Sequence, residues 1–80
     1  MRDLISLILA ALTPEQRDAL RWLPADGSYS VRLPPLEVDL LRFWKITPCV
    51  TVRLTEYISN RGTRLTDLGR QVREAIERDG

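Results

Sequence analysis

Apolar residues recur at a helical spacing in four stretches of this chain and alternate with polar residues in others. A spacing of three and four residues places side chains on one face of a helix, whereas alternation places them on one face of a strand. The predicted helices cover residues 3–12, 13–23, 36–46 and 67–78, and the predicted strands cover residues 29–33, 49–55 and 63–65. The order α-α-β-α-β-β-α predicts an α+β fold in which a small three-stranded antiparallel sheet packs on three to four helices.

The first predicted helix is apolar on nearly all sides. Its apolar residues are Leu4, Ile5, Leu7, Ile8, Leu9 and Leu12. Such a helix is expected to be buried on more than one face. Two interpretations stay open: a helix that belongs entirely to the core, or one that also packs on a second copy of the chain, because a domain of this size has little core to hide it. On the second interpretation these six residues form a homodimer interface.

The second predicted helix has the clearest start signal in the chain. Thr13 suits the N-cap, Pro14 suits the first helical position, and Gln16 completes a capping box. Pro24 is expected to stop this helix, and residues 25–28 then form a turn.

The third predicted helix, residues 36–46, has an apolar stripe made of Leu36, Leu40 and Phe43, which Leu41 and Trp44 widen. We expect this stripe to face the core. Thr47 and Pro48 are expected to end the helix, because the residue before a proline avoids the helical conformation.

A hairpin that runs directly into the last helix is the central feature of the prediction. Residues 59–62, Ser-Asn-Arg-Gly, are typical of a hairpin tip, and Gly62 can adopt the left-handed conformation that a type I turn with a bulge requires. Thr66 suits the N-cap of the last helix, and Asp67 places negative charge at the positive end of the helix dipole.

Length and composition fit one soluble globular domain, residues 1–80, with ordinary apolar and charged fractions. The first apolar run is too short to span a bilayer and makes a poor signal peptide, so we expect no membrane association and a cytoplasmic location. The single cysteine, Cys49, cannot form an internal disulfide. We expect it to be a small buried hydrophobe in a strand, with a redox-sensitive thiol as the alternative.

Candidate chemistry for catalysis is missing from the sequence. The chain has no histidine, and it shows no nucleophile elbow, phosphate-binding glycine loop or catalytic pair of carboxylates. Cysteine and histidine cannot supply a zinc site. We therefore expect neither enzyme activity nor a metal or other cofactor. Trp22, Phe43 and Trp44 are expected in the core or an interface, with a ligand pocket as the alternative.

Positive charge is concentrated in one part of the chain. Residues 42–73 hold six arginines and one lysine against two acidic residues, a net charge of +5, whereas residues 1–41 and 74–80 each have a net charge of −2. The arginines of the predicted hairpin and the adjoining helix are Arg53, Arg61, Arg64, Arg70 and Arg73. As a group they could bind phosphates. Alternatively they form a solvated surface on which Arg70 pairs with Glu74.

The segment Arg64-Leu65-Thr66-Asp67-Leu68-Gly69-Arg70 resembles the Leu-Thr-x-x-Gly-Arg junction that follows the wing in bacterial winged-helix repressors of the MarR and PadR type. Residues 12–16, Leu-Thr-Pro-Glu-Gln, are similar to the opening of a helix in the same families. The resemblance implies a winged-helix domain that regulates transcription and binds double-stranded DNA. In such domains the position of Arg61, at the wing tip, reaches into the minor groove.

The sequence departs from these families between the first predicted strand and the wing. They carry two helices there, and the second enters the major groove, whereas residues 34–46 leave room for one. That helix begins with Glu37 and Asp39, which would repel phosphates. The alternative hypothesis is therefore a protein-interaction or dimerisation module with no nucleic-acid role.

Overall fold

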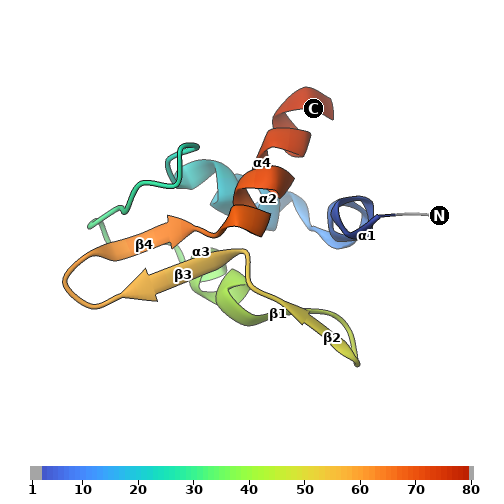
Figure 1. Cartoon of the computed structure of the whole chain (residues 1–80), viewed down its shortest axis with the longest axis horizontal. Helices are drawn as coiled ribbons and strands as arrows, with labels where there is room; N and C mark the ends of the chain where they lie inside the picture. The colour runs from blue at the N-terminus through green and yellow to red at the C-terminus, as the bar shows by residue number, and fades with distance from the viewer. Residues whose placement is uncertain (1–2, 80) are drawn as a thin grey trace.

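The computed structural model describes residues 3–79, with side chains to Arg78. The elements in chain order are helices α1 (Leu4–Ala11), α2 (Pro14–Trp22) and α3 (Leu36–Leu40), the 3₁₀ helix η1 (Leu41–Phe43), strands β1 (Trp44–Thr47), β2 (Val50–Val52), β3 (Thr55–Ile58) and β4 (Gly62–Leu65), and helix α4 (Asp67–Asp79). The predicted α+β class is confirmed. Figure 1 shows the β3–β4 and β1–β2 hairpins projecting on opposite sides of the helices.

The first two helices begin where their capping residues predict. The Asp3 carboxylate accepts a hydrogen bond from the Ser6 amide at 2.8 Å at the start of α1. At the start of α2 the Thr13 hydroxyl accepts from the Gln16 amide at 3.2 Å, and the Gln16 side chain accepts from the Thr13 amide at 3.0 Å. The predicted capping box is therefore confirmed.

The predicted helix 36–46 is wrong in its last three residues. Helical structure ends at Phe43, and Trp44–Thr47 instead forms β1, which pairs antiparallel with β2. Trp44 and Ile46 are half-buried, whereas Lys45 and Thr47 are exposed. Burial of every second residue is the pattern of a strand and differs from the three- and four-residue spacing of a helix. The residues of both strands are rich in β-branched and aromatic side chains, which favour strand pairing over helix.

The predicted strand 49–55 is also interrupted. It splits into β2 and β3, because at Arg53 and Leu54 the chain crosses from one hairpin to the other. The Leu54 amide donates to the Leu41 carbonyl at 3.0 Å, and the Leu54 carbonyl accepts from the Thr66 amide at 3.1 Å. The buried backbone of this crossing is therefore satisfied without a strand partner.

The predicted strand 29–33 is reduced to one bridge. Ser30 exchanges two backbone hydrogen bonds with Thr63 of β4, at 2.7 and 3.0 Å. Beyond it Val31 and Leu33 are 84% and 92% exposed, so their alternation does not mark a buried face. The prolines at 34–35 cannot donate to a strand ladder, which limits this segment. Two two-stranded sheets therefore replace the predicted three-stranded sheet in the described residues.

The β3–β4 hairpin has the predicted tip, whereas its first strand, Thr55–Ile58, begins where the predicted strand 49–55 ends. Tyr57 pairs with Thr63 and Ile58 with Gly62, and Asn60 and Gly62 both have positive φ, 73° and 104°. Gly62 is needed for a second reason. A Cβ atom at this position would lie 2.0 Å from the Ser30 carbonyl oxygen, so no other residue fits beside the Ser30 bridge.

The core lies where α1, α2 and α4 meet the inner side of α3 and the strands. Its most deeply buried large side chains include Ile8, Leu20, Leu41, Leu54 and Leu65. Among the helices within residues 3–79, none combines the length and apolarity of a membrane-crossing segment.

Candidate functional site

The junction between β4 and α4 is held by Thr66, the threonine of the Leu-Thr-x-x-Gly-Arg segment. Its hydroxyl donates to the Arg53 carbonyl at 2.6 Å and accepts from the Gly69 amide at 3.0 Å. The second of these bonds is the predicted N-cap. The first ties the cap to the crossing between the two hairpins, so one side chain fixes how the hairpin meets the helix.

Gly69 allows α4 to touch that crossing. A Cβ atom on Gly69 would lie 1.9 Å from the Leu54 carbonyl oxygen and 2.9 Å from its carbon, so a side chain cannot be accommodated without moving the backbone. The threonine and glycine of the segment are therefore explained by architecture: they join the hairpin and α4 into one unit that positions the arginines.

Two of the predicted arginines on the β3–β4 hairpin lie close to the ring of Tyr29. The guanidinium carbon of Arg61 lies 5.8 Å from the centre of the Tyr29 ring, and that of Arg64 lies 5.0 Å from it. Tyr29 is held there because the next residue, Ser30, pairs with Thr63. The structure thus brings a ring and two cations together at the projecting hairpin, a combination suited to a phosphate chain.

Arg64 is also paired with an acidic residue. Its guanidinium donates to Glu56, which faces it directly across the hairpin. The hydrogen bond and the charge of Glu56 raise the pKa of Arg64. This contact orients the Arg64 side chain, but it also offsets one positive charge of the hairpin.

Arg53 and Arg61 carry the unneutralised charge of this region. Arg53 lies with its guanidinium carbon 5.1 Å from the centre of the Phe43 ring, and Arg61 is exposed at the hairpin tip. Within the side chains that the structure describes, neither arginine has a carboxylate at ion-pair distance. Arg53, Arg64 and Asp67 help to line a shallow pocket of about 360 Å³ between the hairpin and α4.

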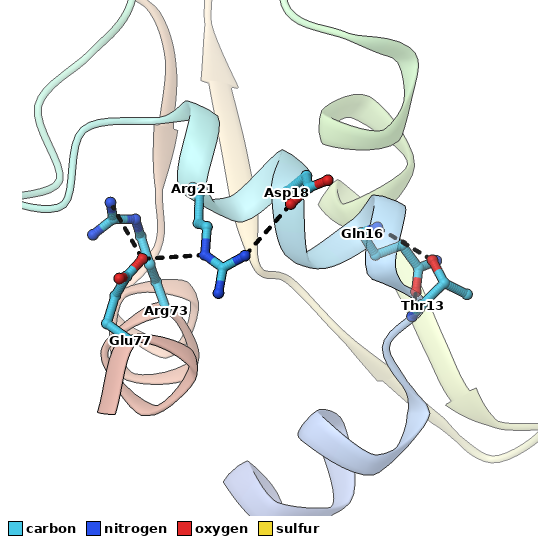
Figure 2. A network of polar contacts seen from close by, with 6 residues as sticks. All are labelled: Thr13, Gln16, Asp18, Arg21, Arg73 and Glu77. Carbon is cyan, nitrogen blue, oxygen red and sulfur yellow. Dashed lines mark hydrogen bonds and ion pairs between the residues drawn. The ribbon is translucent and has the colours of Figure 1, made fainter. Parts of the chain in front are cut away.

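Arg70 and Arg73 have different surroundings from the hairpin arginines. Arg70 lies against Gly27, and its charge adds to the hydrogen bonds from Ser28 that hold the pKa of Asp26 below its ordinary range. The Arg73 guanidinium lies 3.9 Å from the Glu77 carboxylate, and Figure 2 shows it pointing toward that side chain.

The Glu77 carboxylate also accepts a hydrogen bond from the Arg21 guanidinium of α2 at 3.2 Å. Arg73 therefore belongs to a network that links α2 to α4. The i,i+4 ion pair found on α4 is therefore Arg73–Glu77, and Arg73 is half-buried rather than displayed beside the hairpin.

The six residues predicted for a dimer interface divide between core and surface. Ile8 and Leu12 are buried in the core, and Ile5 and Leu9 pack against it. Leu4 and Leu7 remain 41% and 44% exposed. Burial of α1 against α4 therefore accounts for most of its apolar residues.

A larger apolar surface lies on α3 and η1, where the sequence predicted a core stripe. Val38 and Leu41 are the buried residues of this segment, whereas Leu36, Leu40 and Phe43 are 70%, 51% and 64% exposed. The helical spacing of the stripe was correct, but it faces solvent. Burial could not be read from the spacing, because the segment carries apolar residues on both sides.

Leu33 and Tyr57 are also largely exposed, and both line a pocket of about 230 Å³ together with Asp39 and Arg42 of the α3–η1 segment. Asp39 and Arg42 form an ion pair at 3.2 Å, so this pocket has charged walls. We call Leu36, Leu40 and Phe43 the α3 face.

The structure also places the remaining residues that the sequence singled out. Trp22 and Trp44 pack against the core, whereas Phe43 belongs to the α3 face. Cys49 is exposed, so its predicted burial is wrong. It lies in the turn between β1 and β2 that Pro48 begins, and not in a strand that packs on the helices. Within residues 3–79 the acidic and cysteine side chains form no group able to hold a metal ion.

Comparisons with protein-family models, with curated proteins and with solved structures give no match for this chain.

Proposed function

We propose that this chain is a winged-helix-like module that binds double-stranded DNA through the β3–β4 hairpin, with a role in bacterial transcription regulation. The observation that carries the proposal is the placement of Arg61 and Arg64 beside Tyr29 on a projecting hairpin that is locked to α4. Arginine side chains at a hairpin tip can follow the minor groove and its flanking phosphates.

The surroundings of the hairpin suggest a shape-reading and phosphate-binding mode. In the regulators that the junction resembles, a second helix follows the one corresponding to α3, and here the β1–β2 hairpin occupies that part of the chain. Without a helix for the major groove, sequence discrimination is expected to be weak. Affinity then comes mainly from counterion release by Arg53 and Arg61, with a smaller contribution from Arg64, whose charge Glu56 offsets in part.

Salt dependence and matched variants test this proposal. In fluorescence anisotropy with a mixed-sequence duplex, three phosphate contacts predict a slope of log K against log salt of roughly −2 to −3. Arg61→Ala and Arg53→Ala should each weaken binding and reduce that slope by about 1. Arg78→Ala, which removes an exposed charge at the far end of α4, is the matched control and should change little.

The absence of binding at tens of micromolar protein in low salt would defeat the proposal. So would an Arg78→Ala effect as large as that of Arg61→Ala, because binding would then follow net charge rather than the hairpin.

A second candidate function is a protein-interaction or dimerisation module with no nucleic-acid role. It is favoured by the α3 face, since large apolar side chains gathered on one exposed surface often mark a protein–protein contact. Intact self-association with no DNA binding in the anisotropy assay would select this function.

A further inference from the structure

We infer that the α3 face is the surface through which two copies of this chain associate, packed antiparallel about a two-fold axis near Leu40. The inference gives the second candidate function a surface and a partner. It stands whether or not the hairpin binds DNA, because its apolar residues lie outside the hairpin and Arg53 alone is shared between the two proposals. It is also tested by mass rather than by nucleic-acid affinity.

The extent of the α3 face is the first argument. Leu36, Leu40 and Phe43 are 70%, 51% and 64% exposed. A standard interface buries about 800 Å² on each partner. These three side chains can form the apolar centre of such an interface, and the charged residues around them supply its rim.

The α3 stripe is also suited to packing on itself. Leu36, Leu40 and Phe43 follow one another at i, i+4 and i+7 along one side of the α3–η1 segment. An antiparallel copy brings Leu40 against Leu40 and places Leu36 of one copy opposite Phe43 of the other. Both copies then bury the same residues, as a two-fold interface requires.

Charge at the two ends of the stripe fits the same arrangement. Glu37 lies beside Leu36 at one end, and Arg53 lies over the Phe43 ring at the other. Neither forms an ion pair with a described side chain within its own chain. In the antiparallel dimer Glu37 of each copy faces Arg53 of its partner, so two opposite-charge contacts flank the apolar centre.

The first test is the concentration dependence of molecular mass, measured by sedimentation equilibrium. The native chain should dimerise with a dissociation constant in the micromolar range. Leu40→Lys should raise that constant at least tenfold, because two charges enter the centre of the interface. Leu7→Lys changes an equally exposed leucine on α1 and should leave it unchanged.

Circular dichroism melting should show both variants folded. A native chain that stays monomeric at several hundred micromolar would overturn the inference. So would a dimer that Leu7→Lys dissociates and Leu40→Lys does not, because the interface would then lie on α1.

The second test uses the predicted charge pair. Glu37→Arg and Arg53→Glu should each weaken the dimer several-fold, since each change places like charges together twice in a two-fold interface. The double variant restores opposite charges and should recover most of the native affinity. A double variant as weak as the weaker single variant would contradict the antiparallel arrangement.

Discussion

At the scale of single residues, the threonine and glycine of the Leu-Thr-x-x-Gly-Arg segment have mechanical roles. Thr66 joins the crossing between the hairpins to the first turn of α4, and Gly69 lets the Leu54 carbonyl approach that turn. Neither contributes a charge to the hairpin. The segment therefore fixes geometry, and the neighbouring arginines supply whatever binding the surface has.

Replacing Gly69 tests this role. Gly69→Ala should destabilise the fold by about 1–3 kcal/mol or more, because the new methyl group overlaps a backbone carbonyl that cannot rotate away. Urea unfolding followed by circular dichroism measures the change. Gln71→Ala, at an exposed position of the same helix, is the matched control and should stay within about 0.5 kcal/mol of the native chain. An unchanged unfolding midpoint for Gly69→Ala would show that α4 does not press on Leu54.

At the scale of elements, local signals predicted the structure well and pairing signals did not. The capping box at Thr13, the tip glycine Gly62 and the cap of α4 at Thr66 each depend on a few neighbouring residues, and all three are found as predicted. The strand β1 was missed because its partner lies beyond the Pro48 turn, and the helical spacing before it continues smoothly into Trp44. A single sequence shows local preference but not which segment becomes a partner.

The same limit explains why the sequence did not predict the ion pairs of the candidate site. Charge clustering marks Arg53 and Arg61 as cations of the hairpin region, but it could not show that Glu56 pairs with Arg64 or that Glu77 links Arg73 to α2. Those contacts join residues from different strands and helices. The α3 face was missed for a similar reason, since its stripe was read as core.

The capped start of α1 gives a prediction of pH dependence. Hydrogen bonds from Ser6, chiefly from its amide, lower the pKa of Asp3 below the ordinary value of 3.8. The charged Asp3 carboxylate therefore stabilises the fold at pH values above its ordinary pKa, and this contribution is lost as the pH falls through the lowered pKa. Asp3→Asn should lower stability at neutral pH and should reduce the loss of stability on acidification.

Thermal melts of the native chain and of Asp3→Asn between pH 2 and pH 7 measure the effect. Glu74→Gln, at an exposed position of α4 with no ion pair to a described side chain, is the comparison. Identical pH profiles for the native chain and Asp3→Asn would show that this cap does not contribute.

At the scale of the whole molecule, the two proposed surfaces are separate. The hairpin arginines gather around Tyr29, and the α3 face centres on Leu40. Arg53 lies between them, beside Phe43 and next to the pocket at the base of the hairpin. Variants at Arg61 should therefore affect DNA binding alone, variants at Leu40 should affect self-association first, and variants at Arg53 should affect both.

The most direct test of the hairpin proposal is a two-dimensional ¹H–¹⁵N NMR titration with a short mixed-sequence duplex at low salt. The account predicts that the largest shift changes fall on the tip residues 59–63, on Tyr29 and on Arg64, and that they become smaller in Arg61→Ala at the same duplex concentration. Shift changes confined to the β1–β2 hairpin or to α1, or none at a several-fold excess of duplex, would contradict it.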